Sequence, residues 1–404
     1  MARRNLARHG RRSILTCASV AAQAAAIVFF MGYYRGTYDE MFYGAIIDYQ
    51  TAHAQIQAAG LDPDDPAGWV RPRALMTGWR PAAAAARAAP KVVGAAPRLE
   101  MPCLAGDGAE KAPALLAGVD FEEEPKVSVF AARVAKGRLP SASGEVLVGD
   151  GLAELFAWEP GSTIVVQAGT SHGTPNIARF SVAGIFDSGF GSFDSSFLAI
   201  SLPDAQELAD APGAANRVYV KLSSAEALDR AMPAIAAAAS GIGAIARPWT
   251  FYASEAIDHA STETVFYYVF LAVLVAVSAS AIASTMRMAA FERVREVAAM
   301  RATGWTRADV FLLFAMESAA IGIAGSAAGA AVGGAASAIL HIFPVDARAM
   351  SAAIDYPFFS MTSSSQPGDF LVGTLVGSVA ALVAGVAPAR KAARTNIVQA
   401  LSTH

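Results

Sequence analysis

Four long apolar stretches constrain the fold of this chain more than any other feature of its sequence. They cover residues 14–34, 265–286, 310–343 and 370–389. A helix needs ~20 predominantly apolar residues to cross the ~30 Å hydrocarbon core of a bilayer, and each stretch is long enough. The third would extend about 50 Å as a straight helix at ~1.5 Å per residue, so it must tilt, break or project beyond the membrane. The sequence therefore predicts a polytopic α-helical membrane protein with four transmembrane helices.

A cleavable signal peptide is the competing interpretation of the first apolar stretch, because a run of arginines precedes it. The apolar core of a signal peptide is only ~7–15 residues long, whereas residues 14–34 are enough to span a bilayer. We therefore expect this stretch to remain in the protein as a transmembrane helix. The arginines that precede it are Arg3, Arg4, Arg8, Arg11 and Arg12.

Basic residues indicate the orientation of the chain. They cluster before the first stretch, between the second and third, and after the fourth. Short cytoplasmic segments of membrane proteins are enriched in lysine and arginine, so we expect all three to be cytoplasmic. The expected organisation is a cytoplasmic arm (1–13), transmembrane helix 1 (14–35), an extracytoplasmic α+β domain with stalk helices (36–263), transmembrane helix 2 (264–287), a short cytoplasmic helix (288–308), transmembrane helix 3 (309–343), a second extracytoplasmic loop (344–369), transmembrane helix 4 (370–389) and a cytoplasmic tail (390–404).

The segment between the first and second apolar stretches has the pattern of a folded domain. Residues 38–56 and 252–264 carry helical patterns that would continue the adjoining transmembrane helices outward as stalks. Between them, strand-like runs such as 218–222 alternate with helices, one of which begins with a capping signature at 201–204. The fold class expected is thus one helix plus three, with a large α+β extracytoplasmic domain between helices 1 and 2.

The sequence offers no recognisable catalytic machinery. Six histidines and two cysteines are scattered without metal-ligand spacing, which argues against a metal site. A G-x-x-x-x-G-K-[ST] motif is absent, so the chain does not bind ATP through a P-loop. The net charge of −3 argues against a nucleic-acid-binding protein. We therefore expect no catalytic residue, no metal and no cofactor bound by this chain.

The polar connection between the second and third apolar stretches has the pattern of an amphipathic helix. Phe291, Val294 and Val297 form an apolar stripe, and acidic and basic side chains alternate around it. Such a helix either lies passively on the membrane surface or offers its polar face to a partner. The residues placed to make that contact are Glu292, Arg293, Arg295, Glu296, Met300, Arg301 and Gly304.

The end of this helix is marked by local signals. Gly304 suits a left-handed C-cap, and Thr306 with Asp309 has the spacing of a cap for the next helix. The short helix is therefore expected to end at Gly304, with the third transmembrane helix beginning at once.

Glycines recur every four residues in the third and fourth apolar stretches. Small residues on one helical face let membrane helices approach closely. The pattern predicts tight helix packing, either within one subunit or across a dimer. The glycines concerned are Gly325, Gly329, Gly333, Gly373 and Gly377.

Several segments resemble one family of membrane proteins. Residues 295–304, R-E-V-A-A-M-R-A-T-G, closely resemble the R-E-I-x-x-L-R-A-L-G signature of the FtsX-like, or MacB/LolC/LolE-type, ABC transporter permeases. The tail 387–401 is similar to that family's P-A-R-x-A-A ending, although Asn396 and Ile397 replace its proline region. Residues 182–194 resemble its periplasmic domain. The resemblance covers nearly the whole chain.

The resemblance implies a non-catalytic permease subunit of the bacterial inner membrane that works by mechanotransmission. It implies a separate ATPase dimer, which binds ATP and Mg²⁺ and docks on the 288–308 coupling helix. It also implies a second permease subunit, identical or different, and a substrate in the periplasm or outer leaflet. The absence of a fused ATPase domain favours the lipoprotein-releasing branch over MacB-like efflux. The alternatives are an ATPase-coupled regulator of a cell-wall hydrolase and a passive membrane receptor. Thr303 and Trp305 depart from the signature on the docking helix.

Overall fold

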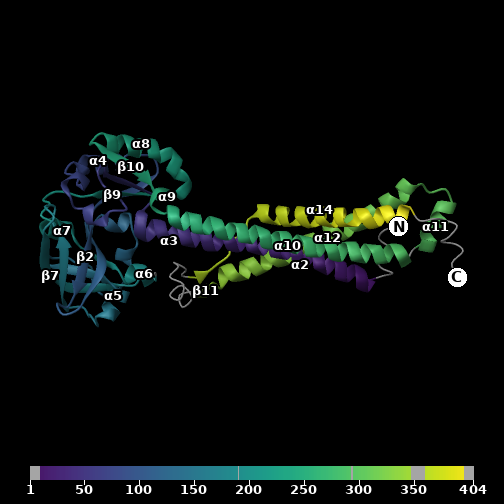
Figure 1. Ribbon diagram of the computed structural model, residues 1–404, viewed down its shortest axis with the longest axis horizontal. Coiled ribbons are helices and arrows are strands. Elements are labelled where there is room, and N and C mark those ends of the chain that lie inside the picture. Colours follow the sequence, from purple (N-terminus) through teal and green to yellow (C-terminus); the bar gives the residue numbers. More distant parts are fainter. Residues whose placement is uncertain (1–9, 190, 293, 347–359, 395–404) are drawn as a thin grey trace. The chain divides into compact units, whose positions relative to one another are not determined.

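The structure, a computed structural model, falls into two compact units, described one by one below (Figure 1). It describes residues 10–189, 191–292, 294–346 and 360–394. The helical unit takes its described residues from segments 1–40, 259–345 and 360–404. The α/β unit takes its described residues from segments 41–258 and 346–359.

A ten-stranded mixed sheet forms the α/β unit, in the order β10-β1-β9-β2-β3-β8-β5-β7-β4, with β6 pairing with β2 and β7. The first and last strands, β1 and β10, are antiparallel neighbours with Ala54 opposite Pro248. The chain therefore enters and leaves the sheet at the same edge. The strands are β1 (Ala54–Ala58), β2 (Val92–Gly106), β3 (Lys111–Val119), β4 (Val134–Gly137), β5 (Glu145–Gly149), β6 (Thr163–Gly169), β7 (Pro175–Phe186), β8 (Phe197–Ser201), β9 (Arg217–Leu222) and β10 (Ala244–Pro248).

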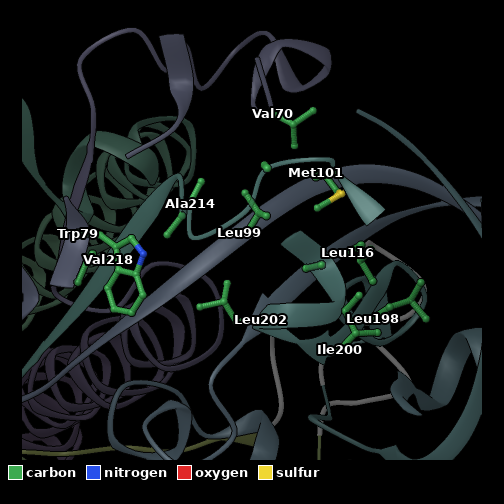
Figure 2. Close-up of a cluster of buried hydrophobic side chains, with 14 of the residues drawn as sticks. Val70, Trp79, Leu99, Met101, Leu116, Leu198, Ile200, Leu202, Ala214 and Val218 are labelled. Atoms are coloured by element: carbon green, nitrogen blue, oxygen red, sulfur yellow. The ribbon is translucent and has the colours of Figure 1, made fainter. Parts of the chain in front are cut away.

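Helices pack on this sheet around one main apolar core. Alternate residues of a strand point to the same face, and Figure 2 shows Leu99 with Met101 on β2, and Leu198 with Ile200 on β8, among the buried side chains. Ser201 accepts a hydrogen bond from the Asp204 N–H and so caps α7, as expected. The helices are α4 (Trp79–Arg87), α5 (Asp150–Leu155), α6 (Gly191–Asp194), α7 (Leu202–Leu208), α8 (Leu228–Ser240) and α9 (Trp249–Tyr252), with short 3₁₀ turns η3 (Pro66–Gly68), η4 (Pro72–Ala74), η5 (Glu124–Lys126), η6 (Phe130–Ala132) and η7 (Ala225–Ala227).

Long helices dominate the helical unit. They are α2 (Gly10–Tyr34), α10 (Ser254–Glu292), α12 (Arg307–Ile342) and α14 (Pro367–Ala393), joined by α11 (Val294–Ala302), β11 (Val345–Asp346) and β12 (Ser360–Met361). The four long helices run side by side (Figure 1). Among the described residues, four helical segments are long and apolar enough to cross a membrane: Thr16–Thr51, Thr264–Thr285, Arg307–Ile342 and Pro367–Ala393. This confirms the four expected membrane helices and the α+β domain between the first and second.

Two helices continue past the apolar stretches that define them. Helical conformation runs on from α2 through η1 (Arg35–Phe42), α3 (Tyr43–Ala45) and η2 (Ile46–Thr51) before β1 begins. At its other end the α/β unit passes from β10 through α9 into α10. The third long helix, α12, is one uninterrupted element of 36 residues, so it does not break.

Candidate coupling site and helix packing

The apolar side of α11 is buried against the ends of the long helices. Val297 and Ala298 are buried in a cluster that includes Val310 and Phe314 of α12 and Ala389 of α14. The same cluster contains Val20 of α2 and Ile282 of α10, with Met300 and Trp305 packed at its edge. One apolar cluster therefore contains side chains of α11 and of all four long helices.

Arg301 ties α11 to the end of α14. Its Nη1 donates a hydrogen bond of 2.8 Å to the carbonyl oxygen of Ala393. That carbonyl lies in the last turn of α14, where the helix dipole favours a positive charge. Of the candidate coupling residues, Met300 and Arg301 are thus half-buried and engaged within the helical unit.

The remaining candidates lie on the opposite, charged side. Arg295 and Glu296 on α11 are exposed, as is Glu292 at the end of α10. Arg293 lies outside the described residues. Exposed charges on a helix whose other side is buried make a surface that a partner can reach.

The turn after α11 is fixed by local chemistry. Gly304 has a φ of +102°, a conformation that side chains other than glycine rarely adopt. Thr306 Oγ1 accepts from the Asp309 N–H (3.2 Å), and the Thr306 N–H donates to Asp309 Oδ2 (2.8 Å), which closes a capping box at the start of α12. The direction in which α12 leaves α11 is therefore set by these three residues.

A basic depression lies along the C-terminal half of α14. It encloses about 850 Å³ and is lined by Val383, Val386, Ala387, Arg390, Lys391 and Arg394. Lys391 Nζ lies 4.9 Å from the centre of the Phe291 ring, within cation–π range.

Among the described residues, no group of three His, Cys, Asp or Glu side chains is placed to hold a metal ion.

The recurring glycines of α12 allow α2 to approach closely. A Cβ atom added at Gly329 would lie 2.0 Å from the carbonyl oxygen of Ala21, and one at Gly333 would lie 2.3 Å from that of Ala25. At Gly325 the corresponding distance to the Cys17 carbonyl oxygen is 2.9 Å. No side chain fits in these spaces, so the stripe is used in packing α12 on α2.

The two glycines of α14 make similar contacts. A Cβ at Gly373 would lie 2.7 Å from Val28 Cγ2 on α2, and one at Gly377 would lie 2.7 Å from Ser326 Cβ on α12. Of the two interpretations of the glycine pattern, packing within one chain is the one that all five positions support.

A polar network at the other end of the bundle was not anticipated from the sequence. Arg35 Nη1 and Nη2 donate to the two carboxylate oxygens of Asp369 at 2.7 and 3.0 Å, and Nη1 also donates to the Ser364 carbonyl oxygen at 2.9 Å. Asp369 also accepts from the Gln366 N–H at 2.7 Å. A lone arginine directly after one apolar stretch and a lone aspartate at the start of another are the signals that could have found the pair, because charges at membrane depth require partners.

The segment 360–366 completes this network. Thr37 Oγ1 donates to the Thr362 carbonyl oxygen (2.9 Å) and accepts from the Thr362 N–H (3.3 Å). The Ser364 N–H donates to the Gly32 carbonyl oxygen at 2.8 Å. Contacts from α12 are a 2.6 Å hydrogen bond between the Ser337 and Ser363 hydroxyls and a 3.1 Å contact of His341 Nδ1 with the Ser363 carbonyl oxygen.

Another buried polar cluster lies inside the α/β unit. Glu100 accepts hydrogen bonds from Arg98, Arg217 and Tyr219, and Arg98 also pairs with Glu124. Burial opposes the ionisation of Glu100, but Arg217 and Arg98 outweigh it and hold its pKa below the usual value. Burial opposes the charge of Arg98 too, yet Glu124 and Glu100 raise the pKa of its guanidinium. Burial raises the pKa of Glu124, in spite of Arg98 beside it. Glu100 and the two arginines are thus the members of the cluster whose charged form is favoured.

A cavity of about 620 Å³ borders this cluster. Arg98, Glu100 and Arg217 line it together with the aromatic rings of Trp69 and Tyr252. Arg217 stacks on Trp69, with its guanidinium carbon 4.0 Å from the ring centre. The exposed acids Asp62 and Asp64 lie among the other lining residues.

Comparison with known proteins gives matches to two domain families, to relatives and to solved structures. The MacB-like periplasmic core domain matches residues 13–238, and the FtsX-like permease C-terminal domain matches residues 268–397. The lipoprotein-releasing system transmembrane protein LolC of Xylella fastidiosa is 26% identical over 367 residues, 87% of this chain and 84% of that protein. The ABC transporter permease YtrF of Bacillus subtilis is 34% identical over 131 residues, 32% of this chain and 30% of that protein. The crystal structure of the periplasmic region of MacB from Actinobacillus actinomycetemcomitans covers 51% of this chain and 93% of its own, at 15% identity and a TM-score of 0.34.

The two domain matches follow one another along the chain and together cover most of it. The first reaches from α2 to α8, and the second from α10 beyond α14. The first match alone exceeds half of the chain, and the partial relative YtrF is named an ABC transporter permease. The chain therefore belongs to the FtsX-like, MacB/LolC-type family of ABC transporter permeases.

Proposed function

We propose that this chain is the permease subunit of an ABC transporter that releases lipoproteins from the bacterial inner membrane, driven by a separate ATPase dimer that docks on α11. The observation that carries the proposal is the two-sided character of α11. Val297 and Ala298 are buried in an apolar cluster that contains residues of all four long helices, whereas Arg295 and Glu296 are exposed. A helix anchored in this way transmits a push on its exposed side to the whole bundle.

In the proposed mechanism, this chain transmits a movement and the ATPase subunits hydrolyse the ATP. The ATPase subunits bind ATP and Mg²⁺, close, and displace α11 on the cytoplasmic side, where the basic ends of the chain also lie. The helices α2 and α10 lead covalently toward β1 and β10, which are paired neighbours. A displacement of α10 along or away from α2 therefore reaches one edge of the sheet in the extracytoplasmic domain.

Lipoprotein is the substrate we favour because the relative that matches most of this chain is named a lipoprotein-releasing protein. A second permease subunit, identical or different, would complete the transporter. The buried network of the α/β unit serves here to hold the domain's shape while force acts on it.

Charge reversal on α11 tests the docking. Arg295→Glu with Glu296→Arg keeps the net charge and helix-forming character but inverts the pattern that a partner contacts. We expect loss of ATPase co-purification and of ATP turnover in the membrane fraction. Glu122→Lys, at an exposed position in the α/β unit, is the matched control and should retain both. Unchanged association and turnover in the α11 variant would rule out this docking site.

Reconstitution tests the substrate. The permease and its ATPase in proteoliposomes should release an acylated lipoprotein to a soluble acceptor when ATP is added. Stimulation of a cell-wall hydrolase without lipoprotein release would instead support a regulatory function. Transport of a small amphiphile alone would support MacB-like efflux.

A further inference from the structure

We propose that Arg35 and Asp369 are positioning residues that join α2, α12 and α14 into one rigid block. When the ATPase closes, α10 then moves relative to this block. The inference rests on the proposed function, because it assigns the moving part of the same transmitter. It concerns the end of the bundle at which α2 leads into the α/β unit.

The ion pair has the geometry of a fixed joint. Both guanidinium nitrogens of Arg35 bond to both carboxylate oxygens of Asp369, at 2.7 and 3.0 Å. Planar two-point pairing of this kind fixes orientation as well as distance. Asp369 is only 2% exposed and lies in the first turn of α14, where it also accepts from the Gln366 N–H. One carboxylate thus holds the start of α14 to the end of α2.

The 360–366 segment extends the joint to α12. It bonds to Gly32 of α2, to Thr37 of η1, which continues α2, and to Ser337 of α12. A Cβ at Gly36 would lie 2.7 Å from the Ser363 Cα, so backbone packs directly on backbone. Together with the glycine contacts along their length, these bonds leave α2, α12 and α14 little freedom to slide.

The fourth helix is held differently. Residues 254–292 contain no glycine, so α10 makes no glycine contact of the kind that joins α12 to α2. Its Ser278 and Ile282 are buried, and Ser278 reaches the Ser19 carbonyl oxygen of α2 only at 3.4 Å. Val269, Val273 and Val277 in its apolar part are 57%, 54% and 62% exposed. Its contacts with α2 include the ring pair Phe30–Phe270, with centroids 5.2 Å apart, and a 2.7 Å hydrogen bond between the Tyr34 and Thr264 hydroxyls. Contacts of this kind can slide or re-form, whereas a bidentate ion pair cannot.

Two properties of the bundle therefore combine. The chain reaches the α/β unit through one helix of the block, α2, and through the loosely held helix α10. Movement of α10 against the block changes the separation of the two chain segments that enter the sheet edge. If the block yielded instead, ATP would be hydrolysed with less movement at that edge.

The first test separates coupling from stability. Arg35→Lys and Asp369→Asn, each in the assembled complex, should keep ATP turnover but lower the lipoprotein released per ATP by about fivefold or more. Ser378→Ala is the matched control, because it removes the hydrogen bonds of Ser378 with Ser326 and with the Thr374 carbonyl oxygen but leaves the Arg35–Asp369 pair intact. Its release per ATP should equal that of the wild type. Equal ratios in all variants, or equal losses of turnover and release, would overturn the proposal.

Cysteine cross-links provide a test that does not depend on a stable ion-pair variant or on the substrate. In a chain lacking Cys17 and Cys103, Ser337→Cys with Ser363→Cys places two thiols where the hydroxyls lie 2.6 Å apart and links the block internally by a disulfide. The thiols of Tyr34→Cys and Thr264→Cys lie too far apart for a disulfide once the tyrosine ring is removed, so a short bifunctional maleimide links α10 to α2. We expect the ATP-bound complex to form the 34–264 cross-link more slowly than the nucleotide-free complex, with no nucleotide effect on the 337–363 disulfide. The opposite pattern would contradict a moving α10. Absence of lipoprotein release by the unmodified complex would instead contradict the proposed substrate. The cross-linking rates would still decide whether α10 moves against the block.

Discussion

Glu100 is the residue on which the buried charge cluster of the α/β unit depends, because three donors converge on its carboxylate. In Glu100→Gln the positive charges of Arg98 and Arg217 lose a compensating negative charge in a buried site. Removing one partner from a buried ionic cluster costs about 3–5 kcal/mol. We expect a large fall in the thermal unfolding midpoint of the detergent-solubilised protein, followed by tryptophan fluorescence. Glu110→Gln on an exposed turn is the control, and an equal midpoint in both variants would contradict the assignment.

Asp194 should give the α/β unit a pH-dependent stability. Burial raises the pKa of Asp194 from 3.8 to about 6, despite hydrogen bonds from Ser188. A carboxyl whose pKa is higher in the folded state holds its proton more tightly when folded. Its contribution to stability is therefore full at low pH and is lost as the pH rises from about 4 to about 6, by at most about 3 kcal/mol.

The Asp194→Asn variant isolates this effect, because an amide keeps an acceptor for Ser188 and does not titrate. The free energy of unfolding of the variant minus that of the wild type should increase between pH 4 and 6 and level off above. Denaturant titrations at several pH values measure this difference. A difference that stays constant across the window would show that Asp194 titrates normally in the folded protein.

At the scale of single elements, the fit of α12 on α2 rests on positions where no side chain is tolerated. Gly329→Leu places a side chain where even a Cβ would lie 2.0 Å from a backbone oxygen of α2. We expect the two helices to separate and the protein to lose folded yield and thermal stability, since overpacking costs ~1–3 kcal/mol or more. Gly368→Ala, where nothing lies within 4 Å of the added Cβ, is the control. Similar stability of the two variants would show that the helices can shift apart without loss.

Local features of the elements were predictable from the sequence, and their partners were not. The caps formed by Thr306 with Asp309 and by Ser201 with Asp204 involve residues three positions apart, so a short window contains the whole interaction. Apolar length likewise sufficed for the long helices. The Arg35–Asp369 pair joins residues more than three hundred positions apart, so the sequence marks two isolated charges beside apolar stretches but does not show that they pair with each other.

The coupling residues show the same limit within one helix. The apolar stripe of Phe291, Val294 and Val297 predicted an amphipathic helix, and Val297 with Ala298 forms the buried side of α11. The stripe was wrong for Phe291, which lies in the last turn of α10 and is 59% exposed. It did not predict that Arg301 bonds to Ala393 and that Met300 packs inward, because both depend on the end of α14. These contacts form only in the folded chain, where the last turn of α14 lies against α11.

For the whole molecule, the orientation in the membrane is the property to establish first. Ala109 in the β2–β3 turn and Ala302 on α11 are both exposed, so each can be replaced by a single cysteine for labelling. With a membrane-impermeant maleimide we expect Ala109→Cys to be labelled in cells whose outer membrane alone is permeabilised, and Ala302→Cys only after lysis. Burial raises the pKa of Cys103 to about 12, so the native thiol there should stay unreactive, and Cys17 is replaced in both variants. Labelling of both positions under the same condition would contradict the topology.

The pairing of β1 with β10 has a consequence for the ancestry of the chain. A domain whose first and last strands are neighbours begins and ends at a single point, so it can be inserted into, or removed from, a helical protein without stretching either part. Residues 54–248 therefore form an inserted domain in a protein of four long helices. Exchanging this domain between permeases at these two strands would change which substrate is recognised while retaining the helices that move.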